Sequence, residues 1–226
     1  MTRNSRHGFT LLDLLIVIAI LATIAYPVYI GIEERAKATK DMNNLRQIGI
    51  ATQLYLNDND SALFSTTGSW MTQLCPKYTA AWGIFQSPFD TRAPSEAGTA
   101  APVSPISYGI NGVGPPSIIG VAADKITKPT IFILFAPAQA SGATVTFQGT
   151  ATDVPGATVF ATAAGQATSV PGGAATAGTQ NNRTKINALF ADLHCETMPW
   201  TTFTDTTPSP TDPSADLRWT PYLPYP

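Results

Sequence analysis

The feature that most constrains this chain is an almost wholly apolar stretch near its amino end. It runs from Phe9 to Ile32 and contains one charged residue, Asp13. From Leu14 to Ile32 no residue is charged. A helix of that length crosses most of a hydrocarbon core about 30 Å thick. We therefore expect this stretch to insert into a membrane.

The residues on either side of the apolar stretch predict its orientation. Arg3 and Arg6 precede it, and Glu33 and Glu34 follow it. Because basic residues tend to stay on the cytoplasmic side, this pattern places the amino end inside the cell. A secretory signal peptide or a simple anchor helix is the plain alternative.

Two details argue against that alternative. A carboxylate such as Asp13 inside a membrane segment costs about 2.5 to 3.5 kcal/mol on insertion scales, and such residues are usually functional. A signal peptidase also needs small residues near the far end of the apolar run. Thr23 and Ala25 could serve, but the helical pattern continues beyond them. For Asp13 itself, a tolerated acid near the membrane surface remains the alternative.

The sequence GFTLLDLL at residues 8–15 resembles the class III signal of type IV pilins and type II secretion pseudopilins. The resemblance implies that a prepilin peptidase cleaves between Gly8 and Phe9 on the cytoplasmic side and methylates the new amine of Phe9. Residues 1–8 are then a cleaved leader. The apolar stretch stays on the mature protein, as both anchor and assembly helix.

The resemblance also implies a role for the acid. In this family an acid at the position of Asp13 pairs with the amino-terminal amine of a neighbouring subunit. A buried charge is very costly when isolated and tolerable when paired. Asp13 and the Phe9 amine are therefore expected to set the register of assembly. The family residue is nearly always Glu, and Asp has a shorter reach.

The helical pattern continues past the membrane segment to Asn57, so that one helix of roughly 70 Å spans residues 9–57. Beyond Ile32 the apolar residues recur every three or four positions, which is typical of one amphipathic face. This stripe consists of Ala38, Met42, Leu45, Ile48, Ala51 and Tyr55. The other faces carry Lys37, Lys40, Asn44 and Gln47. The stripe predicts packing against a globular head, whereas the first half can be buried only in lipid or among copies of itself.

Pro27 and Gly31 interrupt the apolar half of the helix. A proline inside a helix removes one hydrogen bond and kinks or locally opens it. In the family, a proline in this region accompanies a stretch that unwinds on assembly. We expect a local break near Ala22 to Gly31 in the filament; a simple kink that never unwinds is the alternative.

Further segments resemble a pilin-like group whose head ends in a strand of the form N-x-L-F-A-D-G-H. Residues 187–194 read NALFADLH, with Leu193 in place of the glycine, and Asn182 stands where the group has an upstream histidine. The other similar segments are 43–49, Tyr55 with 57–60, 107–112 and 129–135. The resemblance covers the first 60 residues well and the rest in patches.

The pattern after Asp60 predicts short strands and turns. We expect strands at 131–135, 186–191 and 194–198, with a turn near Asp192-Leu193 and a loop at 109–116. The predicted fold is α+β, in which a long N-terminal α-helix, its apolar half protruding, packs on a small antiparallel β-sheet head spanning residues 58–198.

Two segments after Asp60, one inside the head and one following it, differ in composition. Residues 137–182 are rich in Ala, Gly, Thr and Ser, with alternating patterns at 143–147 and 156–162. We interpret them as a surface insertion; disorder is the alternative. Residues 199–226 hold many prolines and interspersed aromatic residues, which predicts an extended, non-helical tail that packs on its own head or a neighbour's.

Composition narrows the class of function. Of the 226 residues, 12% are charged and the formal net charge is −2, which disfavours binding to nucleic acid by phosphate neutralisation. After leader removal His194 is the one remaining histidine, and there is no G-x-S-x-G motif to supply a nucleophile. We therefore expect no catalytic residues and no enzyme.

Cys75 and Cys195 would face an oxidising compartment after export of the head. One disulfide between them would stabilise the head by about 4 to 5 kcal/mol in the chain-entropy model; two free, buried thiols are the alternative. The run Asn57-Asp58-Asn59-Asp60 offers oxygen atoms of the kind that calcium prefers, but it lacks the full EF-hand loop. A polar turn that ends the helix is the preferred interpretation, and we expect no metal or other cofactor.

These observations predict a structural subunit of a type IV pilus-like extracellular filament that polymerises through its N-terminal hydrophobic helix. The resemblance implies as partners copies of itself, a prepilin peptidase, the pilus or secretion assembly machinery and the inner membrane before assembly. A pseudopilin in a periplasmic filament of a type II secretion system is the second hypothesis. A membrane-tethered binding module that never polymerises is the third.

Overall fold

The structure is a computed structural model. It describes residues 11–65, 70–89, 106–111, 120–140, 146–147, 160–161, 167–168, 178–181, 183–205, 207–219 and 221. The chain divides into two compact units, Met1–Lys37 and Ala38–Pro226. Helix α1, Leu11–Asp58, contributes to both.

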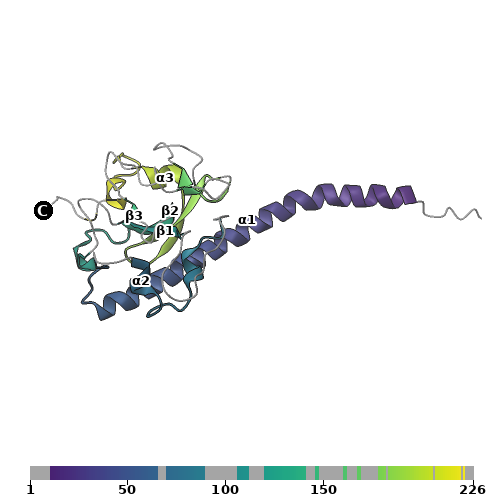
Figure 1. The fold of residues 1–226 in the computed structure, drawn as a ribbon. Helices are drawn as coiled ribbons and strands as arrows, with labels where there is room; N and C mark the ends of the chain where they lie inside the picture. Colours follow the sequence, from purple (N-terminus) through teal and green to yellow (C-terminus); the bar gives the residue numbers. More distant parts are fainter. Residues whose placement is uncertain are drawn as a thin grey trace, which may run out of the picture. The chain divides into compact units, whose positions relative to one another are not determined.

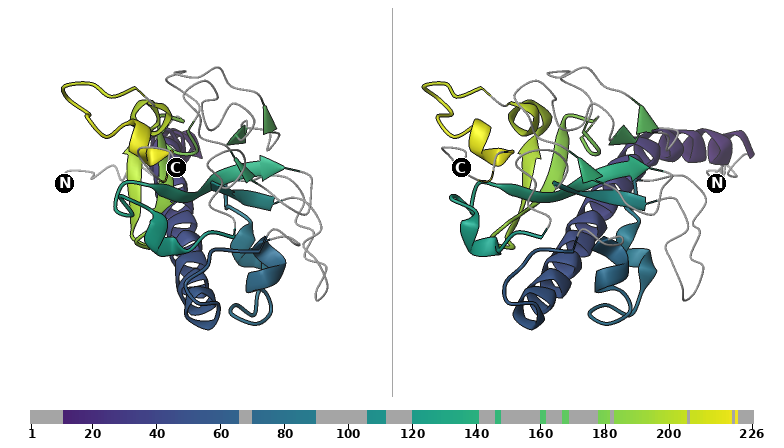
Figure 2. Two further views of the ribbon diagram at one scale, coloured as in Figure 1. Left: turned by 90° about the vertical axis from the view of Figure 1, so that its left-hand side faces the viewer. Right: turned by 60° about the vertical axis from the view of Figure 1, so that its left-hand side comes forward.

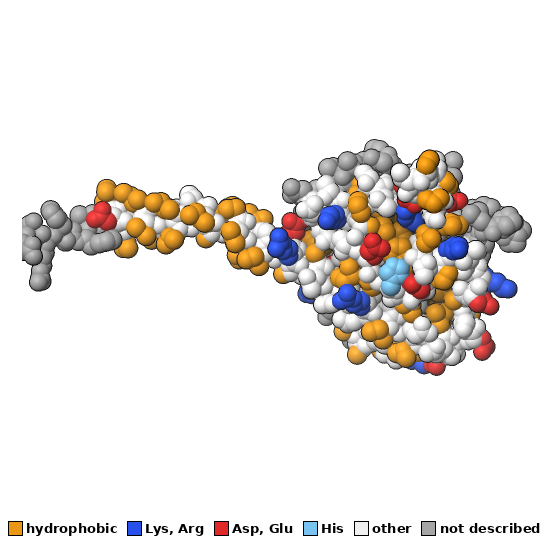
Figure 3. Space-filling model, turned by 180° about the vertical axis from the view of Figure 1, so that it is seen from behind, with side chains coloured by type: hydrophobic (Ala, Val, Ile, Leu, Met, Phe, Trp, Pro, Cys, Tyr) orange, Lys and Arg blue, Asp and Glu red, His pale blue; other side chains and the backbone are white. Residues whose placement is uncertain are grey.

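In the first unit, α1 is helical from Leu11 onward and includes Pro27 without interruption. Every described residue from Leu11 to Glu33 is exposed, and hydrophobic side chains line this part of the helix (Figure 3). The hydroxyl of Thr23 donates to the carbonyl of Ile20 at 2.7 Å. The helix thus satisfies this polar group internally, as an apolar environment requires.

The second unit is built on a five-stranded sheet with the order β3-β1-β2-β6-β7 (Figure 1). Its strands are β1 (Ile106–Asn111), β2 (Ile133–Ala140), β3 (Thr146–Phe147), β6 (Lys185–Phe190) and β7 (Cys195–Pro199). The pairs β1–β2, β2–β6 and β6–β7 are antiparallel, whereas β3 pairs parallel to β1. A separate ribbon joins β4 (Phe160–Ala161) and β5 (Ala167–Thr168). The predicted α+β fold, with a long N-terminal helix and a small antiparallel sheet, is confirmed.

Short helices lie between α1 and β1, between β1 and β2, and after β7. They are α2 (Trp70–Leu74), η1 (Trp82–Phe85), η2 (Ala123–Lys125), α3 (Trp200–Thr204) and η3 (Asp216–Arg218). The extended tail predicted after Pro199 is wrong for α3 and η3. The aromatic residues there form packed contacts instead: the rings of Phe203 and Trp219 lie 4.9 Å apart, and Trp219 Nε1 donates to the carbonyl of Phe203 at 3.1 Å.

The second half of α1 packs on the sheet beside β6 and β7 (Figure 2). The helix lies close to β6 at Gly49, where an added Cβ would lie 3.2 Å from a methyl carbon of Leu189. The buried face of α1 consists of Asp41, Asn44, Leu45, Ile48, Gly49, Ala51, Thr52, Tyr55 and Leu56. Most of the predicted stripe is therefore buried. The outward placement predicted for Asn44 is wrong, because its amide donates to the carbonyl of Gln86 at 3.0 Å.

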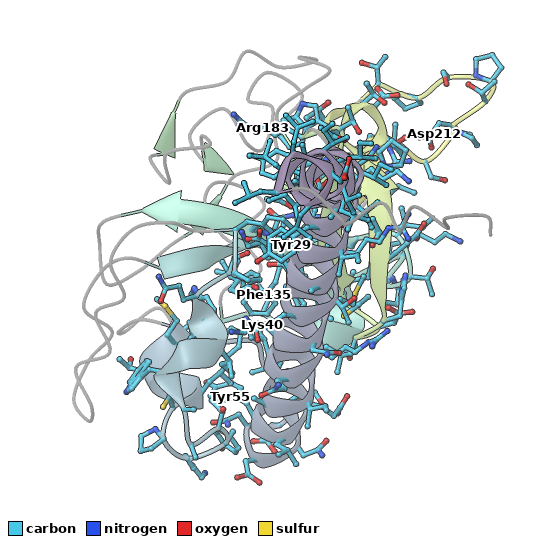
Figure 4. All side chains as sticks on the ribbon, turned by 90° about the vertical axis from the view of Figure 1, so that its right-hand side faces the viewer. Tyr29, Lys40, Tyr55, Phe135, Arg183 and Asp212 are labelled. Carbon is cyan, nitrogen blue, oxygen red and sulfur yellow. The ribbon has the colours of Figure 1, made fainter. Side chains whose placement is uncertain are left out.

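An aromatic cluster forms the core between the end of α1 and the sheet. Tyr55 lies 4.8 Å from Phe64, and Trp70 lies 4.7 Å from Phe135 of β2, measured between ring centroids. Phe64 and Phe135 meet edge to face at 6.1 Å. Figure 4 shows the side chains of this half of α1, with Tyr55 labelled, beside those of the sheet, with Phe135 labelled. These contacts link α1, α2 and the sheet into one core.

The strand boundaries differ from the sequence expectation in two places. β2 starts at Ile133 rather than at residue 131, because Phe132 still closes a turn by donating to the carbonyl of Lys128 at 3.0 Å. Residues 109–111, expected in a loop, complete β1. The β6–β7 hairpin matches the prediction closely. Leu193, at the position of the group's glycine, has a positive φ of 69° in its turn.

The predicted insertion at 137–182 is described only in part. Its first residues extend β2 to Ala140, and Thr146–Phe147 forms the edge strand β3. Most of the remainder of this segment lies outside the described residues. Its interpretation as a surface decoration stays a prediction.

Candidate assembly helix and a buried carboxyl cluster

The expected processing site lies outside the described part of the chain. Gly8 and Phe9 both precede Leu11, where α1 begins in the structure. Asp13 lies in the first turn of α1 and is exposed. A negative charge in this turn is favoured by the helix dipole. Its pairing with a Phe9 amine of another subunit stays a prediction.

The first half of α1 presents an apolar surface that the chain itself does not cover. Its exposed large hydrophobic residues are Leu11, Leu12, Leu14, Leu15, Ile16, Val17, Ile18, Ile20, Leu21, Ile24, Tyr26, Val28, Tyr29, Ile30 and Ile32. Fully burying one such side chain contributes about 1.5 to 3 kcal/mol. Covering the whole set contributes on the order of tens of kcal/mol, far above the stability of a typical domain. The helix is long and apolar enough to cross a membrane.

The disulfide predicted between Cys75 and Cys195 is not present in the structure, where both cysteines are free. Cys75 directly follows α2 and is buried in the hydrophobic core. Cys195 begins β7, where it pairs in register with Leu189. The two thiols are thus held by different elements. Burial raises the pKa of both, that of Cys195 to about 11.

The polar run at the end of α1 is used for side-chain bonds within the head. The Asp58 carboxylate accepts hydrogen bonds from Lys77 Nζ at 2.9 Å and from the Tyr78 hydroxyl at 3.0 Å. The amide of Asn59 donates to the carbonyl of Tyr55 at 2.7 Å. Asp58 thus holds the end of α1 against the chain that follows α2, whereas Asn59 bonds back to α1 itself. Among the described residues, no group of three His, Cys, Asp or Glu side chains is arranged to hold a metal ion.

A fully buried acid, Asp41, lies where the second half of α1 meets the sheet. Its Oδ1 accepts hydrogen bonds from the Ser87 hydroxyl at 2.5 Å and the Tyr108 hydroxyl at 2.6 Å. Its Oδ2 accepts one from Asn187 Nδ2 at 2.8 Å. The three donors come from the segment after η1, from β1 and from β6. One carboxyl therefore connects α1 to three separate parts of the head.

The amide of Asn187 is oriented by its own neighbours. Its Oδ1 accepts from the Thr197 hydroxyl on β7 at 2.6 Å and from Gln180 Nε2 at 2.7 Å. Its Nδ2 is thereby directed to α1, where it donates to Asp41 and, at 3.2 Å, to the carbonyl of Ala38. Asn187 is the first residue of the segment that resembles N-x-L-F-A-D-G-H, which gives that asparagine a structural role.

Burial opposes ionisation of Asp41. Desolvation raises the pKa of the Asp41 carboxyl above its ordinary value of 3.8, and the hydrogen bonds from Ser87, Tyr108 and Asn187 act in the opposite direction. The pKa of the Tyr108 phenol is raised well above 10.0, mainly by burial and then by the negative charge of Asp41. The phenol therefore remains a hydrogen-bond donor to the carboxyl.

Sequence reasoning did not identify this cluster. The spacing of Asp41 in the sequence could have indicated it. Asp41 lies three residues after Ala38 and four before Leu45, which places it inside the predicted apolar stripe. An acid at such a position is either strongly paired by hydrogen bonds or absent from the core. The partner residues Ser87, Tyr108 and Asn187 are distant in sequence, and no local pattern connects them to it.

Comparison of the chain with models of protein families, with curated proteins and with solved structures finds no match. The architecture itself, a long N-terminal apolar helix packed on a small antiparallel sheet, is compatible with a pilin-like fold.

Proposed function

We propose that this protein is a structural subunit of a type IV pilus-like extracellular filament, held in the inner membrane before assembly. The single observation that carries the proposal is the exposed apolar surface of residues 11–32 on a helix whose continuation is anchored in a folded head. Such a surface must be covered by lipid in the precursor and by the apolar helices of other subunits in a polymer. The mechanism is packing of helices, with no catalytic step.

The chemistry of assembly follows from the resemblance of residues 8–15 to the prepilin signal. A prepilin peptidase would release Phe9 with a methylated amine, and Asp13 would pair with that amine on a neighbouring subunit. The pair offsets the cost of burying either charge alone. An assembly ATPase and a platform membrane protein would move subunits from the membrane into the filament.

Mass spectrometry on filaments sheared from intact cells tests the proposal. We expect an abundant chain that begins at methylated Phe9. A processed chain found in the membrane fraction and absent from sheared filaments would instead identify a pseudopilin of a type II secretion system. An uncut bond between Gly8 and Phe9 would overturn the pilin-like assignment.

A further inference from the structure

One side of α1 carries polar groups into its contact with the head. The carbonyl of Ala38 accepts a hydrogen bond from Asn187 Nδ2 at 3.2 Å. The carboxyl of Asp41, three residues later, accepts one from the same amide at 2.8 Å. The amide of Asn44, three residues later again, donates to the carbonyl of Gln86 at 3.0 Å. The contact of α1 with the head therefore contains a row of polar groups as well as the apolar stripe.

We propose that these polar contacts make the head selective for one half of α1. The head accepts residues 38–58 and rejects the apolar residues 11–32, whether these come from its own chain or from another copy. The selecting groups are the hydroxyls of Ser87 and Tyr108 and the amide of Asn187, and the group that they select is the carboxyl of Asp41. The use of this selectivity in a filament, where the apolar helices of many copies are close together, rests on the proposed function; the selectivity itself does not.

The apolar half of α1 is a competitor for the surface of the head that contacts α1. Residues 11–32 carry many exposed large apolar side chains, and the hydrophobic effect is not directional, so apolar contacts alone distinguish poorly between two apolar helices. Because these residues are joined to the head by the chain itself, their effective concentration near it is high. Selection of the correct half therefore requires groups that an apolar helix does not satisfy.

The buried donors of the head penalise an apolar helix. Tyr108 and Asn187 are fully buried, and Ser87 is 4% exposed. From Leu14 to Ile32 no residue is charged, so this stretch has no carboxylate that could accept their hydrogen bonds. Its polar side chains are three hydroxyls, each with two lone pairs, whereas the carboxyl of Asp41 accepts three hydrogen bonds at once. An apolar helix would leave buried donors without an acceptor, which is costly inside a protein.

Gly49 excludes the parallel register in which the apolar half could supply an acid. Asp13 is the one acid of that half, and Leu21 follows it at the same spacing of eight residues at which Gly49 follows Asp41. With Asp13 in the place of Asp41, Leu21 would occupy the place of Gly49. An added Cβ there already lies 3.2 Å from Leu189, so a leucine side chain would overpack the contact. Within residues 9–58, only Asp41 and Gly49 are an acid and a glycine eight residues apart.

A triple variant separates selectivity from stability. Asp41→Leu with Ser87→Ala and Tyr108→Phe replaces the acid and two of its donors by apolar side chains, and such matched replacements are often neutral for stability. The third donor, Asn187, keeps the carbonyl of Ala38 as its acceptor. In urea unfolding followed by tryptophan fluorescence, we expect the triple variant to unfold at a higher urea concentration than Asp41→Leu alone, which leaves all three donors in place.

Capture of an apolar helix by the full chain in detergent micelles measures the selectivity itself. The probe is a synthetic peptide of residues 9–37 with a photo-reactive benzophenone side chain in place of Ile24. Cross-links to residues 38–226 are quantified by mass spectrometry after illumination, with cross-links to residues 11–32 as the internal reference. We expect at least about tenfold more cross-links to residues 38–226 in the triple variant than in the wild type, because the penalty for an apolar helix is removed.

A single variant keeps the test decisive if the triple variant does not fold. Tyr108→Phe retains the buried ring and removes one donor to Asp41, so cross-links to the head are expected to rise several-fold. Tyr78→Phe, which removes a hydroxyl bonded to the exposed Asp58, is the matched control and should give the wild-type value.

The selectivity is overturned if a folded triple variant captures the peptide no better than the wild type, or if it unfolds at the same urea concentration as Asp41→Leu. Equal capture by Tyr108→Phe and Tyr78→Phe overturns it as well. None of these measurements depends on filament formation, which the sheared-filament experiment addresses separately.

Discussion

Asn187 on β6 and Asp41 on α1 are joined by a 2.8 Å hydrogen bond across 146 positions of the chain. The bond is buried, and the orientation of the Asn187 amide is set by Thr197 and Gln180. The second half of α1 is therefore attached to the head by a buried polar contact as well as by apolar packing. Because a hydrogen bond has a defined direction and length, this contact fixes the rotation of α1 on the sheet more narrowly than apolar packing would.

Replacing the acid of the apolar segment should separate assembly from folding. Asp13→Ala is expected to abolish filaments, because a buried Phe9 amine without its partner costs about 3 to 5 kcal/mol. The stability of the head should change by less than about 0.5 kcal/mol, since Asp13 is exposed and belongs to the first unit of the chain. Filaments are counted by electron microscopy, and Asp13→Glu is the conservative control. Full activity of Asp13→Ala in cells would favour a membrane-tethered module that does not polymerise.

Two large apolar residues on the second half of α1 face away from the sheet. Ile50 is 64% exposed and Leu54 is 45% exposed. Burial of one such side chain against a neighbouring subunit contributes about 1.5 to 3 kcal/mol. Ile50→Asp should therefore reduce filament yield while the thermal unfolding of the head stays the same. Gln47→Asp, at another exposed position of the helix, is the control. Equal yields from both variants would show that Ile50 lies outside the filament interfaces.

The close approach of α1 to β6 makes Gly49 intolerant of a larger side chain. An added Cβ would already lie 3.2 Å from Leu189, so Gly49→Val is expected to destabilise the head by about 1 to 3 kcal/mol through overpacking. At Gly31 no atom lies within 4 Å of an added Cβ, and Gly31→Val should leave the head unaffected. Urea unfolding followed by tryptophan fluorescence measures both. An unchanged midpoint for Gly49→Val would contradict the packing described.

The two thiols should react slowly in the native head. The pKa of Cys195 is raised to about 11 and that of Cys75 is also raised, in both cases chiefly by burial. Near pH 8 little thiolate is present, so alkylation should be slow before denaturation and fast after it. The intact mass of the protein isolated from cells without reductant provides a second measurement. A mass lower by two hydrogens would show that the Cys75–Cys195 disulfide forms and that the free thiols described are incorrect.

Much of the fold follows from local patterns in the sequence. The helix up to Asp58 was predictable because its first half is continuously apolar and its second half has helical spacing. The β6–β7 hairpin was predictable because an apolar run precedes a turn at Asp192-Leu193. Both signals arise from neighbours in the chain. They failed at the start of β2, where Phe132 is apolar yet closes a turn, and after Pro199, where the aromatic residues fold back in short helices.

The sequence by itself determined the membrane-length helix, the position of Asp13 and the α+β class, because these depend on composition and on periods of a few residues. Only the tertiary structure decided that Asn44 points inward, that both cysteines are free thiols and that Asp41 is the polar centre of the helix–sheet contact. Each of these depends on groups brought together from distant parts of the chain. The free energy of a buried polar side chain is set by the partners that the fold supplies.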